Sequence, residues 1–584
     1  MYLLALPLLV LFVNALFNNN RYALRTIKWF INSVFFLVLF LCAADIPFFN
    51  HFNYRINSAS LMWAESTDMV ISMIAQDPSY WGVLVPFALV ILVFFKLHTR
   101  FIKRFFISPT VSISWLKNSI WFLVSGGVCF LALRGTVDFN RSPLNAKDAY
   151  FSNYSILNQM ALSPVYTFLK SMTEQQKSSN ADLDLMESDK AFEEVRKQLN
   201  RTYLNNNSLA TLHRPDSQHI TQPNVVLVLM EGLSAAKLAS YGDTNNCTPY
   251  LDTLIQQSYF FNNAYSAGLH THNGIYSSIT SFPALFERHG MTQIPILRYN
   301  NLISNLRDHD YQTIYFSNHD VEFDNVGGFL VENGIQQMVS ERDYDLSKKL
   351  SVWGVPDDYM FDFSIPYLNK LAANKKPFFG LYMTTSNHRP FRFPENYQRR
   401  FESDENEGAA YADWSIEQWM EKVKKEDWFE NTLFVFMSDH GWAIKPRYDI
   451  PLNYVHVPLF FYSPKYFPAA ITNDKLAAQI DVFPTIMSAL KLPYTQTDLG
   501  VDLFSNTRPY VYFNADDKLG VLNKNYYYIY RKNGPESLYE IPRLENILDE
   551  NKAIADSMKN YAFSQMQVSH DLIQKNRVGK PGTK

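Results

Sequence analysis

Reactive side chains follow four short apolar segments of this sequence, at or close to the point where each segment ends. The segments are 224–230, 313–317, 378–385 and 432–438, and the residues that follow them are Glu231, His319, His388, Asp439 and His440. Runs of this length that are rich in Val, Leu, Phe and Tyr are typical of buried strands in a parallel sheet. Because ligand sites in such sheets form beyond the carboxyl ends of the strands, we expect these side chains to converge, although some lie about 200 residues apart.

Glu231, Asp439 and His440 together offer two carboxylates and one imidazole. A mixed oxygen and nitrogen set of this kind suits zinc or manganese. Taken singly, Glu231 is also explained as a carboxylate at a helix start, and Asp439-His440-Gly441 as an ordinary strand-to-loop junction. The combination predicts one divalent metal ion, with Mn²⁺, Zn²⁺ and Mg²⁺ as the candidates.

The segment 267–283, AGLHTHNGIYSSITSFP, supplies a nucleophile for such a site. Thr271 precedes a Gly-Ile-Tyr-Ser-Ser stretch that is predicted to begin a helix. At a helix N-terminus, a coordinated cation and the helix dipole both stabilise an alkoxide, and the same position favours a phosphate group. Capping the helix is the alternative role of Thr271, and the two roles are compatible. His270 and His272 are interpreted either as walls of the pocket or as surface residues.

An α/β domain at 223–550 is predicted to position these residues. Short apolar segments alternate with amphipathic helical stretches, which is typical of a largely parallel sheet sandwiched by helices. We interpret five segments as buried parallel strands, namely the four above and 457–462.

The remaining segments of the polar part are predicted to be helical or irregular. Residues 136–222 form a juxtamembrane and helical linker with little core, and 551–584 form a basic C-terminal tail that frays. The segments WGVPDDYMFD and YADWSIEQW are predicted to be amphipathic helices whose tryptophans, Trp353, Trp414 and Trp419, belong to the core.

The first 135 residues are predicted to form a multi-span membrane anchor. Their four apolar segments are 1–17, 26–49, 80–96 and 118–134, and about 20 helical residues cross the hydrocarbon layer. Basic residues concentrate in the connections 18–28 and 96–117, so the positive-inside rule places these in the cytoplasm. We therefore expect a multi-pass protein of the cell membrane whose catalytic domain lies outside the cytoplasm. This orientation requires an external N-terminus, which one further span upstream would explain, and buried helices of a soluble protein are the alternative.

Net charge and cysteine usage exclude other classes of protein. The formal net charge of -3 gives no basic field that would attract nucleic acid. Of the three cysteines, Cys42 and Cys129 lie in apolar segments, so Cys247 has no partner for an intrachain disulfide in the polar part.

Nine motifs occur in order between about residues 222 and 505: NVVLVLMEG, TPYLDTL, AGLHTHNGIYSS, WGVPDDYMFD, TTSNHRPF, YADWSIEQW, SDHG, HVPLFFYSP and QIDVFPTI. With these motifs the chain resembles the lipoteichoic acid synthase family of the alkaline phosphatase and sulfatase superfamily. The resemblance implies that one divalent metal is bound by Glu231, Thr271, Asp439 and His440. It also implies that Thr271 is the nucleophile and that His319 and His388 lie around the substrate phosphate.

The resemblance further implies a phosphotransferase that works in two steps. Thr271 attacks the phosphodiester of a phospholipid donor in the membrane, and diacylglycerol leaves. A phosphoglycerol group then passes from the threonine to a hydroxyl of a glycan or lipid acceptor. The metal would act as Lewis acid, nucleophile generator and template, and His388 or His319 would be the acid to the leaving alcohol.

One segment departs from the family pattern. Gram-positive members carry a Trp and an Arg shortly after the histidine equivalent to His319, where this sequence has HDVEFDNVGGFL. Asp320 and Asn325 are the candidate substrate-binding residues in this segment. Without the guanidinium, bidentate recognition of phosphate is lost or supplied elsewhere.

A second metal is also considered. His456 precedes Val-Pro, as does a histidine of the related phosphoethanolamine transferases that helps to hold a second zinc. His388 and His456 are therefore candidates for a second metal or for substrate binding. A hydrogen bond in the core is the alternative role of His456.

Three other functions compete with phosphoglycerol transfer. A phosphoethanolamine transferase would share the fold and the metal site, although such enzymes usually carry several periplasmic disulfides. A sulfatase-like hydrolase or phosphodiesterase would act on soluble substrates, but the Cys247-Thr248-Pro249 run has Leu251 where sulfatases have arginine, so we reject sulfatase chemistry. The third is a catalytically inactive envelope protein, against which the retained Glu, Thr, Asp and His set weighs.

Overall fold

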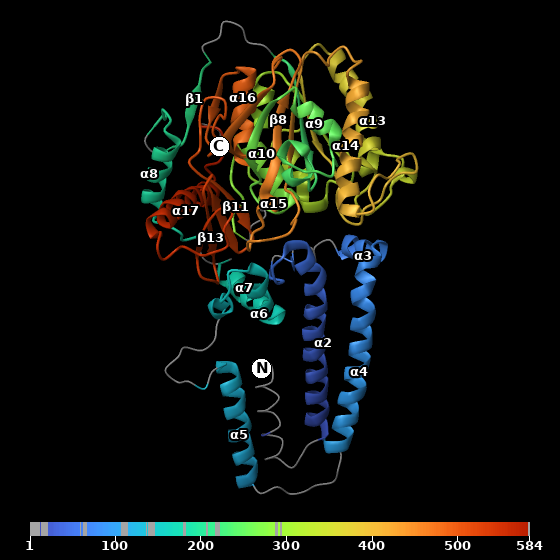
Figure 1. The fold of residues 1–584 in the computed structure, drawn as a ribbon, viewed down its shortest axis with the longest axis vertical. Helices are drawn as coiled ribbons and strands as arrows, with labels where there is room; N and C mark the ends of the chain where they lie inside the picture. Colours follow the sequence, from blue (N-terminus) through green and yellow to red (C-terminus); the bar gives the residue numbers. More distant parts are fainter. Residues whose placement is uncertain are drawn as a thin grey trace. The chain divides into compact units, whose positions relative to one another are not determined.

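The computed structural model of this chain describes residues 12, 21–58, 60–61, 67–106, 115–135, 137, 146–178, 183–205, 208–215, 222–286, 290–292 and 295–581. The chain divides into two compact units. The first comprises Met1–Met62 and Asp77–Gln176, and the second comprises Trp63–Gln76 and Lys177–Lys584. The second unit contains the α/β domain that carries the predicted site residues (Figure 1).

An eight-stranded sheet forms the centre of the larger unit, in the order β5-β4-β6-β2-β7-β8-β3-β9. Its strands in chain order are β2 (Asn224–Met230), β3 (Tyr259–Tyr265), β4 (Gln312–Ser317), β5 (Gln337–Val339), β6 (Phe378–Met383), β7 (Thr432–Ser438), β8 (His456–Tyr462) and β9 (Ile471–Ala478). The predicted α/β fold with a largely parallel sheet is confirmed.

One strand runs against the others. β8 pairs antiparallel with both β7 and β3, whereas the other neighbouring pairs of this sheet are parallel. The expectation that 457–462 is a parallel strand is therefore wrong. The connection from β7 contains only the short helix α15 (Leu452–Val455), and without a crossover helix a neighbouring strand returns in the opposite direction.

Helices cover the sheet because its central strands are apolar on both faces. On one face, α9 (Pro249–Ile255), α13 (Asp357–Ala373) and α14 (Asp404–Val423) pack into a common hydrophobic core with β2, β6 and β7. On the other side of the sheet lie α10 (Thr271–Thr280), α11 (Leu302–Asp308) and α16 (Val482–Leu490), which contact one another (Figure 1). Between β4 and β5, α12 (Val326–Glu332) completes the connection.

The tryptophan predictions have different outcomes. Both Trp414 and Trp419 belong to α14. Trp419 is fully buried in the core, as expected, while Trp414 is only partly buried. Trp353 does not belong to the core, because α13 begins only at Asp357 and residues before it form an irregular segment. The helix predicted over WGVPDDYMFD therefore starts four residues late.

A second, antiparallel sheet follows the main domain. It consists of β11 (Val511–Ala515), β12 (Lys518–Leu522), β13 (Tyr526–Arg531) and β14 (Ser537–Glu540). The helix α17 (Lys552–Gln574) packs against β12, β13 and the linker helix α8 (Ser188–Leu199). The expected frayed tail is wrong for 552–574, because this helix buries an apolar face that includes Met558, Ala562 and Met566.

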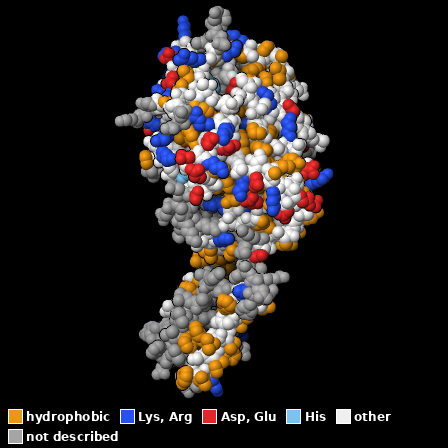
Figure 2. Space-filling model, turned by 90° about the vertical axis from the view of Figure 1, so that its left-hand side faces the viewer, with side chains coloured by type: hydrophobic (Ala, Val, Ile, Leu, Met, Phe, Trp, Pro, Cys, Tyr) orange, Lys and Arg blue, Asp and Glu red, His pale blue; other side chains and the backbone are white. Residues whose placement is uncertain are grey.

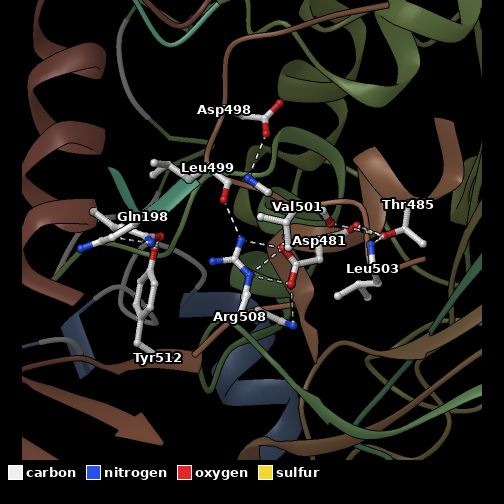
Figure 3. A network of polar contacts seen from close by, with 12 residues as sticks. Gln198, Asp481, Thr485, Asp498, Leu499, Val501, Leu503, Arg508 and Tyr512 are labelled. Atoms are coloured by element: carbon white, nitrogen blue, oxygen red, sulfur yellow. Dashed lines mark hydrogen bonds and ion pairs between the residues drawn. The ribbon is translucent and has the colours of Figure 1, made fainter. Parts of the chain in front are cut away.

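A buried network of polar contacts connects several segments of the larger unit (Figure 3). The guanidinium of Arg508 donates to both carboxylate oxygens of Asp481 and to the carbonyl of Leu499, at 2.5–2.8 Å. The two charged side chains are 1% and 0% exposed. Nearby, Gln565 of α17 bridges Tyr512 of β11 to Gln198 of α8. A further two-stranded sheet pairs β1 (Thr211–His213) with β10 (Tyr494–Gln496), so the linker segments are part of the folded unit.

The smaller unit contains the apolar helices α2 (Arg21–Phe52), α4 (Trp81–Phe106) and α5 (Trp115–Arg134), followed by α6 (Ser155–Ala161) and α7 (Pro164–Ser178). In the described part of the chain, three stretches are long and apolar enough to cross a membrane: Lys28–Phe52, Pro78–Arg100 and Trp115–Ala132. They match the predicted second, third and fourth spans, and the first predicted span, 1–17, lies outside the described residues apart from Phe12. Figure 2 shows acidic and basic side chains interspersed on the visible face of the larger unit and hydrophobic side chains along the apolar helices.

Candidate active site

Glu231 and Asp439 lie side by side because β2 and β7 are adjacent parallel strands in register. Met230 is paired with Ser438, so the next residue of each strand emerges at the same edge of the sheet. The backbone N–H of Asp439 donates to the carbonyl of Met230 at 3.1 Å, which extends the ladder by one residue. The local β-structure therefore fixes both carboxylates at the carboxyl end of the sheet.

Glu231, Asp439 and His440 present one ligand atom each within 4.8 Å of one another. The Nε2 of His440 lies 3.7 Å from Oε1 of Glu231 and 3.5 Å from Oδ2 of Asp439. Those two carboxylate oxygens are buried and have no hydrogen-bond partner, although Oδ1 of Asp439 accepts the N–H groups of Gly232 and His440. Among the residues that the structure describes, this is the one cluster of His, Cys, Asp and Glu with such geometry.

These residues fit a divalent cation. Burial, and then the neighbouring Asp439 carboxylate, raise the pKa of Glu231 well above its usual value. Two buried carboxylates that repel each other, each with one oxygen that accepts no hydrogen bond, are costly unless a cation compensates them. The Nδ1–H of His440 donates to the carbonyl of Gly441 at 2.9 Å, which leaves Nε2 with the lone pair that a metal ligand needs. Such a set of two oxygens and one nitrogen could hold a divalent metal ion.

Thr271 begins α10 and points its hydroxyl at this cluster. Its Oγ1 donates to Oε2 of Glu231 at 3.2 Å. The close approach of α10 depends on Gly274, because an added Cβ there would lie 2.7 Å from the Cβ of Asp439. The Oδ1 of Asn273 accepts the N–H of His270 at 3.3 Å and so fixes the first turn of the helix. The sequence pattern Thr-His-Asn-Gly thus places a hydroxyl at a helix N-terminus beside two carboxylates.

His319 and His388 follow β4 and β6 and share a local arrangement with His440. In each case Nδ1 lies 2.6–2.9 Å from the carbonyl of the next residue, so Nδ1 carries a proton, and in the neutral imidazole Nε2 is the acceptor. Burial, with smaller contributions from the nearby His440 and His319, lowers the pKa of His388 to about 4. Burial also lowers the pKa of His319. Both imidazoles are therefore neutral near pH 7.

Trp353 contacts both of these histidines. Its ring centroid lies 4.2 Å from that of His388 and 5.8 Å from that of His319, and the phenyl ring of Phe323 adds an edge contact to His319. A small pocket opens beside His388 between Trp353 and Arg392. The sequence predicts a core position for Trp353. In the structure its irregular segment lies between the ends of two strands, and this tertiary arrangement brings the indole beside His319 and His388.

Each histidine next to Thr271 faces a carboxylate from a distant segment. Nε2 of His270 lies 2.9 Å from Oδ1 of Asp516, and Nδ1 of His272 lies 3.6 Å from Oδ2 of Asp324. The two imidazole rings are stacked, with centroids 5.2 Å apart. The sequence leaves the roles of both histidines open. It gives no sign of the two aspartates, since no motif links a turn of the second sheet with residue 270.

Two residues that were predicted to bind substrate, Asp320 and Asn325, contact other groups. The carboxylate of Asp320 pairs with Arg342 at 3.3 Å and is 44% exposed. The Nδ2 of Asn325 donates to the carbonyl of Met291 at 2.7 Å.

His456 has the surroundings of a core residue. Its Nε2 lies 3.1 Å from the carbonyl of Asn262, and its ring stacks on Tyr265. It is not one of the clustered ligand residues. The hydrogen bond that sequence analysis gave as the alternative role of His456 is present.

Residues 223–492 match the sulfatase family. The chain is 25% identical over 320 residues to the lipoteichoic acid synthase-like protein YvgJ of Bacillus subtilis, over 49% of this chain and 50% of that protein. It is 26% identical over 227 residues to lipoteichoic acid synthase of Staphylococcus aureus, over 34% of this chain and 33% of that protein. The alignments thus span half or less of these relatives.

Two solved structures have the same fold. A protein of the alkaline phosphatase superfamily from Vibrio parahaemolyticus superimposes with a TM-score of 0.62 and 23% identity, over 68% of this chain and 98% of that chain. The lipoteichoic acid synthase LtaP from Listeria monocytogenes superimposes with a TM-score of 0.53 and 17% identity, over 67% of this chain and 99% of that chain.

Proposed function

Because this chain is a lipoteichoic acid synthase-like member of the alkaline phosphatase and sulfatase superfamily, we propose that it is a membrane-bound, metal-dependent phosphotransferase. It moves a phosphoglycerol-type headgroup from a phospholipid to a glycan or lipid acceptor through a phospho-threonine intermediate. The single observation that carries the proposal is the hydroxyl of Thr271, hydrogen-bonded to a buried carboxylate within a three-residue metal-ligating cluster.

Glu231, Asp439, His440 and Thr271 would hold the metal, which when bound supplies Lewis acidity and lowers the pKa of a coordinated hydroxyl. In the first step the Oγ1 of Thr271 forms a bond to the donor phosphorus, and the bond from phosphorus to the diacylglycerol oxygen breaks. The threonine loses its hydroxyl proton, and the leaving alkoxide gains one. The position of Thr271 at the N-terminus of α10 adds a favourable dipole for the phosphoryl oxygens.

In the second step an acceptor hydroxyl forms the new bond to phosphorus, and the Thr271 oxygen leaves. The acceptor gives up a proton and Thr271 regains one, so the cycle needs no net proton. A neutral imidazole whose Nδ1 carries the proton is suited to take the acceptor proton at Nε2, which supports His388 or His319 in this role. The same imidazole, once protonated, can return a proton to the leaving oxygen.

The membrane location of the donor explains the three apolar helices. A phospholipid is held in the bilayer, so an enzyme anchored in the same bilayer does not have to extract it. We propose that the catalytic domain lies outside the cytoplasm, which the distribution of basic residues between the apolar helices supports.

Mass spectrometry of the full-length protein in detergent tests the transferred group. After incubation with labelled phosphatidylglycerol or phosphatidylethanolamine and without acceptor, we expect the peptide containing Thr271 to gain glycerol phosphate. A gain of phosphoethanolamine would instead identify the alternative transferase. The Thr271→Ala variant should remain folded and show neither adduct nor turnover. The proposal is overturned if neither lipid gives an adduct or turnover, or if Thr271→Ala keeps full activity.

A further inference from the structure

The irregular segment 353–356, together with the first residue of α13, passes between the two turns that carry His319 and His388. At its start, the indole of Trp353 contacts both imidazoles, and its Nε1–H donates to the carbonyl of Arg389 at 2.7 Å. At its end, Asp357 begins α13. The segment therefore connects two turns that belong to different strands of the sheet.

The carboxylate of Asp357 is the acceptor that joins the two turns. Its Oδ1 accepts from Nδ2 of Asn318 at 3.1 Å, from the backbone N–H of Thr385 at 3.0 Å and from that of Ser386 at 3.2 Å. In return, the backbone N–H of Asp357 donates to Oγ of Ser386 at 2.9 Å. Asp357 is 1% exposed. One oxygen atom thus binds the residue before His319 and two residues shortly before His388.

A second set of bonds holds the segment against the turn of His319. Asn318 donates through Nδ2 to the carbonyl of Val355 at 2.8 Å and accepts the N–H of Val355 at 3.2 Å. Gly354 has φ of +87°, and an added Cβ there would lie 1.9 Å from the carbonyl oxygen of Asn318. The approach is so close that only glycine fits, which makes the separation of the segment and the turn well defined.

The orientation of each imidazole follows the backbone of its own turn. Because Nδ1 of His319 and of His388 is bonded to the carbonyl of the very next residue, the ring cannot reorient without breaking that bond. The position of each Nε2 is then set by where its turn lies. A misplacement of about 1 Å costs on the order of 100-fold in rate when reacting groups must be aligned.

We propose that Asp357 is a positioning residue that fixes the spacing between His319 and His388 by tying their turns together. The inference rests on the proposed function for its kinetic consequence, since that function gives the two histidines their roles. Its structural consequence does not depend on that function. Asp357 touches no reacting group and acts through the two turns.

Hydrogen exchange of the full-length protein tests the structural consequence. In Asp357→Ala we expect the backbone amides of 316–321 and 384–390 to exchange at least 10-fold faster, while those around Glu231 and Asp439 keep their protection. Asp413→Ala is the matched control, because Asp413 is equally buried and also accepts two consecutive backbone N–H groups, of Tyr250 and Leu251, at 3.1 and 2.7 Å. It should loosen the start of α9 and leave both histidine turns unchanged.

A milder variant covers the case in which Asp357→Ala does not fold. Asn318→Ala removes the two side-chain links from the turn of His319, to Asp357 and Val355, and keeps the backbone bond from Val355 and the links of Thr385 and Ser386. We expect faster exchange in 316–321 only. Unchanged exchange of both turns in Asp357→Ala, or equal loosening of both in Asn318→Ala, would overturn the proposal.

A double-mutant cycle with His388→Ala tests the kinetic consequence, using turnover of phosphatidylglycerol. Alone, Asp357→Ala should lower kcat about 100-fold with a much smaller change in KM. Added to His388→Ala it should cost little more, because its effect passes through that histidine. Fully additive losses would contradict a positioning role. If the wild-type protein turns over no lipid, the proposed function fails, and the exchange measurement still decides the role of Asp357.

Discussion

Three histidines at the edge of the sheet share one local arrangement, which suits two different roles. His319, His388 and His440 each donate Nδ1–H to the carbonyl of the following residue and keep a lone pair on Nε2. For His440 this lone pair faces two carboxylates and suits a metal. For the other two, burial lowers the pKa and keeps the imidazole neutral, which suits proton acceptance. The carbonyl of the following residue fixes which ring nitrogen carries the proton. The role that each histidine can take then depends on the groups that face its Nε2.

Replacing Glu231 by glutamine should separate metal binding from stability. The substitution removes one of two buried carboxylates that repel each other, so the metal-free protein should unfold at a higher temperature. The same change removes a ligand, so Mn²⁺ or Zn²⁺ should no longer raise the unfolding temperature. For comparison, a ligand at 100 times its Kd stabilises by about 2.7 kcal/mol. Thermal unfolding with added metal and with chelator measures both effects.

The pH dependence of the same experiment gives a second check. The pKa of Glu231 is raised in the folded metal-free protein above the 4.5 of an ordinary glutamate. The folded state therefore binds the proton more tightly, and stability should increase as the pH falls through the folded pKa towards 4.5. The glutamine variant should lack this increase. An unchanged metal response, or a pH profile identical to the wild type, would contradict the assignment of Glu231.

At the scale of elements, Thr271, the proposed nucleophile, is positioned by the contact between α10 and the end of β7. Gly274 allows this contact, since it lies three residues after Thr271 on the same helix and touches Asp439. The helix has no room to approach with a larger residue. Its N-terminus, and with it the hydroxyl of Thr271, is therefore held at a fixed height above the carboxylates.

Gly274→Ala is predicted to lower turnover by at least 10-fold while the domain stays folded. The new Cβ pushes α10 away from Asp439, and a misalignment of about 1 Å costs on the order of 100-fold in rate. Lipid turnover and circular dichroism of the purified protein measure the two parts. Gly127 in the apolar helix α5 is the matched control, because an added Cβ there meets nothing within 4 Å. Equal activity of Gly274→Ala and Gly127→Ala would show that the contact does not position Thr271.

At the scale of the whole molecule, polar contacts connect segments of the larger unit that lie far apart in the sequence. The pair of Arg508 and Asp481 is buried within the domain, and Gln198 of α8 reaches Gln565 of α17. Breaking a buried ion pair by removing one partner leaves a charge without compensation. These links make the linker and the last helix part of the folded domain.

Arg508→Ala should destabilise the protein by about 3–5 kcal/mol, because the carboxylate of Asp481 is left buried without its counter-charge. The shift of the unfolding midpoint in urea measures the loss. Arg298→Ala is the control, since the pair of Arg298 and Glu332 is exposed at the surface and should contribute little. Equal midpoints for the two variants would refute the stabilising role of the buried pair.

The sequence by itself determined the parallel core strands and the residues at their ends. Buried strands are apolar on both faces, so β2, β4, β6 and β7 are visible as short apolar runs, and the polar residues that follow them must meet at one edge of the sheet. Convergence of Glu231, Asp439 and His440 was therefore expected from the sequence, whereas the neighbouring positions and register of β2 and β7 come from the structure. The apolar helices were visible as long apolar runs with few charged residues.

The tertiary structure alone decided which distant groups support those residues. Asp357 contacts Asn318 and Thr385, and Asp516 contacts His270, through hydrogen bonds between segments that no local pattern connects. The antiparallel direction of β8 and the burial of α17 also depend on what each element packs against. Local periodicity reports which face of an element is apolar, whereas a partner for a buried polar atom is chosen only when the chain has folded around it.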